Sequence, residues 1–185
     1  ETPIPGLFVL EPKVHFDERG HFLEVFNSVL ATELGLPEDI RQINRSLSSS
    51  SVLRGLHFQR PPQAQTKTVQ CEKGEIFDVA VDLRVGSPTY GRWHGVLLSE
   101  NNKKMLFVPV GFAHGFLTSV TSIVTYFCSD SVYHGPSEGG LRWDDPGLGI
   151  DWPCGLPPMV SQRDRSWPAM SEFVSPFTFD GGGKP

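Results

Sequence analysis

One short segment of the sequence gathers several side chains that could move protons. Arg54-Gly55-Leu56-His57-Phe58-Gln59 offers a guanidinium, an imidazole and an amide, and the ammonium of Lys67 follows ten residues after His57. Imidazole is the side chain best matched to proton transfer near neutral pH. A histidine on a strand can equally be structural, so the segment by itself leaves both interpretations open.

A second histidine lies between glycines, in Gly111-Phe112-Ala113-His114-Gly115-Phe116. Glycine lets a ligand or another backbone approach closely. His114 could therefore contact a ligand, or it could bond a backbone carbonyl in the interior of the fold.

The chain has three tyrosines, Tyr90, Tyr126 and Tyr133. A phenol suits a general acid that returns a proton to a carbanion, and it also stacks on a flat base. Tyr90 lies in a turn, Ser87–Gly91, where a packing role is the simpler interpretation.

The acidic residues differ mainly in their surroundings. Asp78 and Asp82 lie four residues apart within an apolar run, so both need partners, for which arginine would suffice. Asp164 lies in Ser161-Gln162-Arg163-Asp164-Arg165, and these neighbours predict a surface acid.

The elements that must position these side chains are short strands between turns rich in Gly and Pro. This pattern is typical of a sandwich, jelly roll or barrel. The predicted strands are Leu7–Val14, Phe22–Phe26, Arg41–Ser46, Val52–Gln59, Thr66–Glu72, Phe77–Leu83, Val96–Leu98, Met105–Val108 and Ile123–Cys128. One helix is predicted over Ser28–Leu34, with Ser28 as its cap and Gly35 at its end. The C-terminal third, rich in Pro, Trp and Gly, is expected to wrap the barrel in irregular structure.

The predicted strand Val52–Gln59 raises a geometric problem. Side chains alternate between the two faces of a strand, so Arg54 and His57 would point in opposite directions. For both to reach one ligand the strand must bend or bulge, and Gly55 is the obvious place.

Size and charge limit the classes of function. The 185 residues suit one domain, which we place at residues 1–170, with a flexible tail over 171–185. A net charge of −5 argues against a nucleic-acid partner. We expect no membrane span and no signal peptide. Three scattered cysteines fit neither a disulfide framework nor a zinc site, which favours the cytoplasm.

The histidine spacing argues against a metal centre. Barrels of the cupin type usually offer two histidines separated by one residue, then a glutamate and a distant histidine. His57 has no such neighbour, and no glutamate follows until Glu72. A single imidazole cannot hold a transition metal. We expect neither a metal nor a cofactor.

Several stretches together resemble the dTDP-4-dehydrorhamnose 3,5-epimerase family and its relatives in antibiotic deoxysugar pathways. They run in the family's order over residues 3–168. The stretches are Phe16–Glu24, Gln42–Ser46, Val52–Gln59, Gly74–Arg84, Gly86–Gly91, Pro109–Phe116, Arg142–Pro146 and Ser161–Asp164. The resemblance implies an all-β, cupin-like jelly roll barrel with a few short helices, which forms a homodimer. The implied substrate is a dTDP-4-keto-6-deoxy sugar, inverted at C3, C5 or both.

The resemblance also implies roles for individual residues. His57 matches the general base, Asp164 the acid that orients it, Lys67 the cation at the enolate and Tyr126 the proton donor on the opposite face. These roles fit the chemistry, because a C4 ketone acidifies the neighbouring C–H bonds and an enolate needs a cation. The implied substrate contacts are Arg19, Glu24, Gln42, Asn44, Arg54, His114 and Tyr133, with Arg19 and Glu24 reaching the nucleotide across a dimer interface.

The segment Ser131–Pro136 departs from the family pattern. Many relatives carry two adjacent tyrosines where this chain has Val132-Tyr133, and the segment is one residue longer. The departure favours the antibiotic-sugar branch and leaves the inverted centre open. Three alternatives are a 3,4-ketoisomerase on the same substrate, a non-catalytic sugar-nucleotide binding barrel and a metal-dependent cupin dioxygenase.

Overall fold

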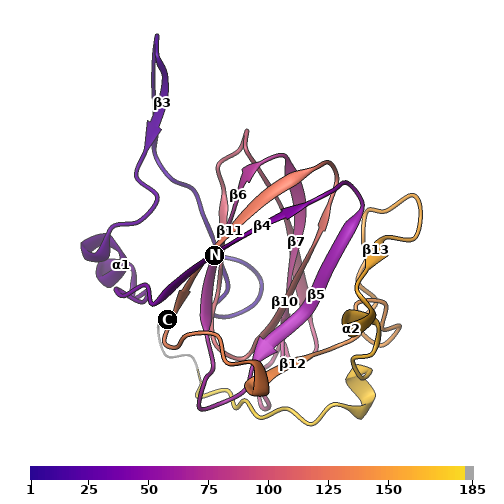
Figure 1. Cartoon of the computed structure of the whole chain (residues 1–185). Helices are drawn as coiled ribbons and strands as arrows, with labels where there is room; N and C mark the ends of the chain where they lie inside the picture. The colour runs from indigo at the N-terminus through magenta and orange to yellow at the C-terminus, as the bar shows by residue number, and fades with distance from the viewer. Residues whose placement is uncertain (182–185) are drawn as a thin grey trace.

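The computed structural model describes residues 1–181, which form two facing β-sheets and one projecting hairpin (Figure 1). The five-stranded sheet has the order β1-β9-β6-β11-β4. Its strands are β1 (Phe8–Leu10), β9 (Met105–Val108), β6 (Thr66–Lys73), β11 (Ser122–Ser129) and β4 (Gln42–Ser48). The six-stranded sheet has the order β12-β5-β10-β7-β8, and β13 pairs with β5. Its strands are β12 (Glu138–Gly140), β5 (Val52–Gln59), β10 (Phe112–Thr118), β7 (Glu75–Asp82), β8 (Trp93–Ser99) and β13 (Met159–Val160).

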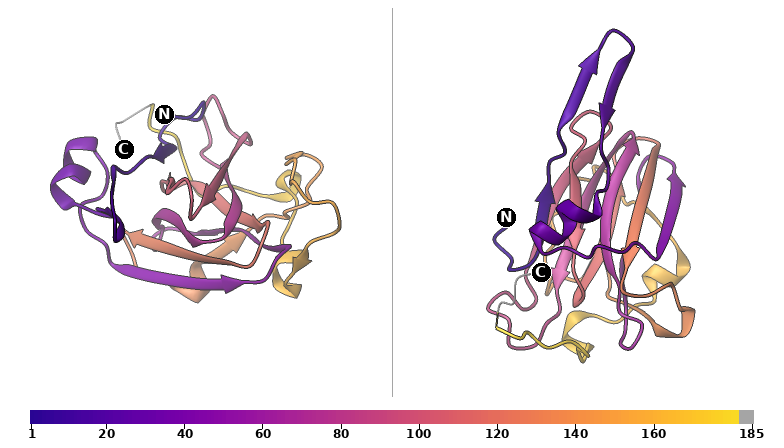
Figure 2. Two further views of the ribbon diagram at one scale, coloured as in Figure 1. Left: turned by 90° about the horizontal axis from the view of Figure 1, so that it is seen from above. Right: turned by 90° about the vertical axis from the view of Figure 1, so that its left-hand side faces the viewer.

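The remaining elements are short. The hairpin consists of β2 (Val14–Asp17) and β3 (Gly20–Leu23), and it extends away from the barrel (Figure 2). The helices are α1 (Ser28–Leu34) and α2 (Gln162–Arg165), with 3-10 turns η1 (Gly135–Ser137) and η2 (Met170–Glu172). No helix within residues 1–181 is long and apolar enough to cross a membrane.

The six-stranded sheet is covered on both faces, which explains the nearly continuous apolar run of β7. Inside the barrel, Ile76 and Phe116 pack against Val69 of the other sheet. On the outer face, Val79 packs in a second core to which Trp152 of the C-terminal wrap belongs. The two sheets thus form the jelly roll barrel that the sequence predicts.

Most predicted elements lie where the structure has them, but several differ from it in their bounds. The predicted bounds of α1, β5 and β9 are confirmed. Gly35 ends α1 in the left-handed region with φ 72°, but the cap is Asn27 and not Ser28, because the Asn27 side chain accepts from the backbone N–H groups of Val29 and Leu30. Strand β10 was not predicted at all.

The glycines of β10 belong to a strand because they let the neighbouring strand come close. A Cβ on Gly115 would lie 2.7 Å from the carbonyl oxygen of Arg54 on β5. Only glycine fits there, so a residue that usually marks a turn lies in the middle of the sheet.

The segment expected as a tail from residue 171 is packed against the barrel as far as it is described. Phe177 is buried in the outer core, and Thr178 bridges to Val85. Phe179 lies against the guanidinium of Arg84. The packed part of the chain therefore extends at least to residue 179, while residues 182–185 of the predicted tail lie outside the described residues.

Candidate active site

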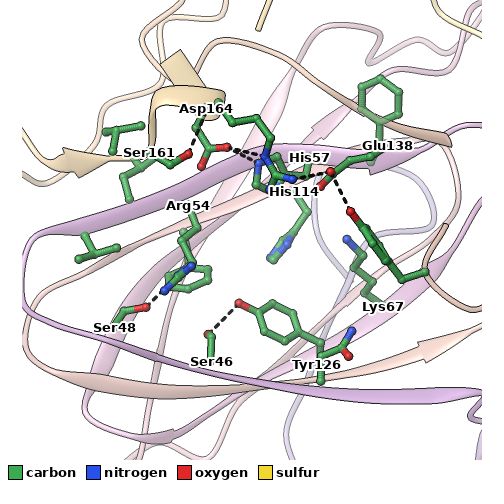
Figure 3. Close-up of a pocket in the computed structure, with 18 of the residues that line it drawn as sticks. Ser46, Ser48, Arg54, His57, Lys67, His114, Tyr126, Glu138, Ser161 and Asp164 are labelled. Carbon is green, nitrogen blue, oxygen red and sulfur yellow. Dashed lines mark hydrogen bonds and ion pairs between the residues drawn. The ribbon is translucent and has the colours of Figure 1, made fainter. Parts of the chain in front are cut away.

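A cavity of about 770 Å³ lies in the barrel between the two sheets. Figure 3 shows side chains from both sheets and from α2 around this one space. Of the catalytic and substrate-binding residues predicted from the sequence, those that line the cavity are His57, Lys67, Tyr126, Asp164, Asn44, Arg54, His114 and Tyr133.

His57 is hydrogen-bonded to Asp164 on one wall of the cavity. The Nε2 atom of His57 lies 2.7 Å from Oδ1 of Asp164, and the backbone N–H of Gly55 donates to Oδ2 at 3.3 Å. Burial acts to raise the pKa of Asp164, but the hydrogen bonds from His57 and Gly55 outweigh it and hold that pKa below its usual value. An ionised carboxylate only accepts hydrogen bonds, so His57 carries its proton on Nε2 and leaves Nδ1 to take a proton from a ligand.

Asp164 is not the surface acid that its neighbours in the sequence predict. It is 3% exposed, because Ser161 caps α2 and accepts from the Asp164 backbone N–H at 3.1 Å. This short helix turns the aspartate inward against β5 while Arg163 stays at the surface.

The predicted irregularity of β5 is confirmed at Gly55. The pairing with β10 shifts between His114 and Phe116, which pair with His57 and Arg54. Gly55 has φ 131°, a conformation that favours glycine. The extra residue reverses the alternation of side chains, so Arg54 and His57 line the same cavity.

Tyr126 lies on β11 of the opposite sheet and faces the same space as His57 (Figure 3). Its hydroxyl lies 3.2 Å from that of Ser46 on β4. Burial raises the pKa of Tyr126 well above its usual value, so the phenol keeps its proton at neutral pH.

Lys67 and His114 bring positive charge and a second imidazole to the interior. Burial lowers the pKa of the Lys67 ammonium. His114 does not bond a backbone carbonyl; its Nε2 lies 2.7 Å from Oδ1 of Asp78, which is fully buried. Asp82 has the arginine partner that the sequence suggests, Arg84.

The rim of the cavity is a network of amides and charges. Gln42 accepts from the backbone N–H of Tyr133 and donates to Asn44, although it does not itself line the cavity. The Tyr133 hydroxyl donates to Glu138, which also pairs with Arg163 at 2.6 Å.

Arg19 and Glu24 are the predicted site residues that this chain does not bring to the cavity. Arg19 lies at the turn of the projecting hairpin and pairs with Asp17, and Glu24 accepts from Asn27. Their side chains are exposed on the hairpin and the segment that follows it.

Four residues of the site were missed in the sequence. Ser46 and Ser48 hold Tyr126 and Arg54, and Glu138 and Arg163 form the charged pair at the rim. The two serines could have been predicted. Both lie at even spacings from Gln42 along β4, so their side chains share the face of the strand on which Gln42 lies. Nothing in the sequence near Glu138 signals its role.

The geometry suits proton transfer. A base on one wall faces a protonated phenol on the other, and Lys67 and a second imidazole, that of His114, lie between the two sheets. Within residues 1–181 no cluster of three His, Cys, Asp or Glu side chains could hold a metal ion. An arrangement of this kind can take a proton from one face of a bound molecule and return one to the other face.

Known proteins resemble this chain over nearly its whole length. The family model for dTDP-4-dehydrorhamnose 3,5-epimerase matches residues 1–172. The dTDP-4-dehydrorhamnose 3,5-epimerase of Methanothermobacter thermautotrophicus is 48% identical over 175 residues, which cover 93% of this chain and 94% of that protein. A crystal structure of the 3,5-epimerase from Legionella pneumophila in complex with dTDP-4-keto-L-rhamnose is 42% identical, with a TM-score of 0.91 and 96% of each chain covered. A 3′-monoepimerase from Streptomyces bikiniensis in complex with dTDP-quinovose is 34% identical, with a TM-score of 0.85, over 92% of this chain and 86% of that one.

Proposed function

Since this chain belongs to the dTDP-4-dehydrorhamnose 3,5-epimerase family, we propose that it epimerises dTDP-4-keto-6-deoxy-D-glucose at both C3 and C5. The observation that carries this proposal is the His57–Asp164 pair on one wall of the cavity with the protonated Tyr126 on the other. Inversion of both centres is supported by the higher identity to 3,5-epimerases than to the monoepimerase. A 4-keto-6-deoxy sugar epimerase from the novobiocin biosynthetic gene cluster is 38% identical to this chain.

His57 acts as the base in this proposal. Its Nδ1 takes the proton from the carbon next to the C4 ketone, and the imidazolium that forms is stabilised by the Asp164 carboxylate at 2.7 Å. The carboxylate can only accept a hydrogen bond from Nε2. It therefore keeps the ring proton on Nε2 and leaves Nδ1 free to accept the substrate proton.

Lys67 and Tyr126 complete the reaction. As the proton leaves, negative charge develops on the C4 oxygen, and the ammonium of Lys67 stabilises it. The phenol of Tyr126 then donates a proton to the opposite face of the carbon, which inverts the centre. The raised pKa of Tyr126 keeps this proton in place between turnovers.

Substrate contacts are assigned to the polar groups around the cavity. Asn44, Arg54 and His114 lie on its walls, with Tyr133 at the rim and Gln42 behind it. Arg54 lines the cavity, where its Nε donates to Ser48 and its Nη2 to the carbonyl of Leu47, so the remaining N–H groups are available for a diphosphate. The exposed phenol ring of Tyr133 is available to stack on the nucleotide base.

We further propose a homodimer in which the hairpin of one protomer reaches the cavity of the other. Phe16 and Phe22 on the hairpin are 77% and 71% exposed, which is unusual for two phenylalanines on one short element. Arg19 lies between them and could meet a phosphate only in a second copy.

The unpaired thiols of Cys71, Cys128 and Cys154 fit a cytoplasmic protein.

The reaction is tested by deuterium exchange in heavy water. Proton NMR of dTDP-4-keto-6-deoxyglucose follows exchange at C3 and C5, and the product spectrum distinguishes an inverted centre from a ketone moved to C3. The wild type should exchange both positions and His57→Ala neither. Exchange at one carbon would indicate a monoepimerase, and its absence at both would remove the proposal.

The dimer is tested by sedimentation and by mixing two impaired variants. Arg19→Ala keeps its own His57, and His57→Ala keeps its own Arg19, so only a mixed dimer contains a complete site when Arg19 acts in the partner's cavity. Random exchange of protomers should restore about a quarter of the wild-type sites. If mixing restores nothing while mixed dimers form, Arg19 does not act across the interface.

A further inference from the structure

A second histidine–aspartate pair joins the wall of the cavity to a residue behind it: His114 lines the cavity, whereas Asp78 does not and has no role in the reaction described above. His114 of β10 and Asp78 of β7 are joined at 2.7 Å, and the carboxylate is fully buried within the barrel. The other oxygen, Oδ2, has no hydrogen-bond partner among the described residues. A buried carboxylate oxygen without a donor is destabilising, so packing alone does not explain an aspartate here.

Lys67 is the buried cation whose charge interacts with that of Asp78. Burial raises the pKa of Asp78 and lowers that of Lys67, and the charge of each group opposes the effect of burial on the other. Cys128 and Glu138 also favour the charged lysine. Burial raises the pKa of the Cys128 thiol, so it is neutral near pH 7, and Glu138 is already paired with Arg163 at 2.6 Å. Asp78 is thus one of three groups whose charge favours the protonated lysine, after Cys128 and Glu138, and it is the fully buried carboxylate among them.

The bond to His114 adds a second effect. An ionised Asp78 requires a proton on Nε2 of His114, which leaves Nδ1 as the ring nitrogen for a ligand. Figure 3 shows the His114 ring in the middle of the cavity, between His57 and Lys67. The other titratable groups that interact with Asp78 are Tyr126 and Cys71, and burial keeps both protonated near neutral pH.

We propose that Asp78 is a positioning residue for the proposed epimerisation, which keeps Lys67 charged and orients His114 so that both can meet the C4 oxygen of the substrate. Asp78 does not touch the substrate itself, since it does not line the cavity. The inference rests on the proposed function for its catalytic consequence, but its electrostatic part is a property of the free protein.

The first test is the pH profile of Asp78→Asn. Without the buried carboxylate, Lys67 should lose its proton at lower pH, because an opposite charge nearby shifts a pKa by about 1–3 units. The pKa of the basic limb in the pH profile of kcat should fall by about as much. Above that new pKa, kcat should drop about tenfold for each pH unit. Asp82→Asn is the matched control, because Asp82 is equally buried on the same face of β7 but bonds Arg84 outside the cavity. It should lower the melting temperature and leave the limb in place.

A folded Asp78→Asn enzyme whose basic limb coincides with that of the wild type would overturn the proposal. Should that variant fail to fold, Lys67→Met tests the same coupling from the other side, since linkage is reciprocal. Carbon-13 NMR of the Asp78 carboxyl should show its titration at higher pH in Lys67→Met than in the wild type, and an unchanged titration would refute the inference. This measurement needs no turnover, so it is distinct from a failure of the proposed function, in which the wild type would exchange neither C3 nor C5.

Discussion

Replacing Asp164 by asparagine should disable the base while leaving the site intact. The backbone N–H of Gly55 donates to Oδ2 of Asp164, so the amide oxygen of Asp164→Asn will occupy that position and its NH2 group will face His57. The NH2 group donates, which forces Nε2 of His57 to accept and moves the ring proton to Nδ1, the atom that must take the substrate proton. The charge that stabilised the imidazolium at 2.7 Å is lost as well.

An imidazole held in the wrong tautomer typically lowers kcat by about 10³- to 10⁴-fold, or about 4 to 5.5 kcal/mol in the barrier. The assay is deuterium exchange at C3 and C5, with dTDP affinity and the melting temperature measured alongside. Both should change little. Asp164→Ala should be less harmful, because the ring is then free to adopt either tautomer.

Asp144→Asn provides the control, since Asp144 is a paired but exposed acid that bonds Arg142 away from the cavity. It should exchange both carbons at the wild-type rate. A folded Asp164→Asn enzyme that keeps more than about a tenth of the wild-type rate would show that His57 does not depend on this carboxylate.

Four further outcomes are expected. Tyr126→Phe should lower inversion by about 10²- to 10⁴-fold while deuterium still enters with retention, as seen by NMR; equal losses of exchange and inversion would speak against a separate donor. Gly55→Ala should reduce unfolding free energy by about 1–3 kcal/mol more than Gly20→Ala, because both glycines have φ near 131° but only at Gly55 would a Cβ meet the next strand, at 2.6 Å; equal denaturation midpoints would contradict this. Asp82→Asn should lose about 1–3 kcal/mol at pH 7; the native state lowers the pKa of Asp82, so the deficit should vanish on acidification through that pKa, and a deficit independent of pH in urea titrations would refute it. Under native conditions a thiol reagent should rapidly modify only the exposed Cys154, and rapid reaction of all three cysteines would contradict their burial.

Local patterns were enough for much of the scaffold. The bounds of α1, β5 and β9 follow from alternation, branched side chains and glycine, which act within a few residues. The same alternation predicted that β5 must be irregular, because Arg54 and His57 could not otherwise share a face. The bulge at Gly55 confirms that reasoning.

Local patterns failed where a distant segment decides the environment. Asp164 has the neighbours of a surface acid, yet it is buried against a strand 107 residues away in the sequence. The glycines of β10 resemble a turn, but they are required by the close approach of β5. The pairing of Asp78 with His114 spans 36 residues and could not be derived from either segment.

The sequence by itself determined the all-β class, the net charge of −5 and the presence of an imidazole near a bulge-forming glycine, because these depend on composition and on a period of two. The family resemblance supplied the roles of Asp164 and Tyr126. Only the tertiary structure decided that these groups surround one cavity, which hydrogen bond sets the tautomer of His57, and which carboxylate pairs with His114. Those properties arise from burial and from distances of a few ångströms between strands. Both depend on segments far apart in the sequence, so local sequence patterns do not determine them.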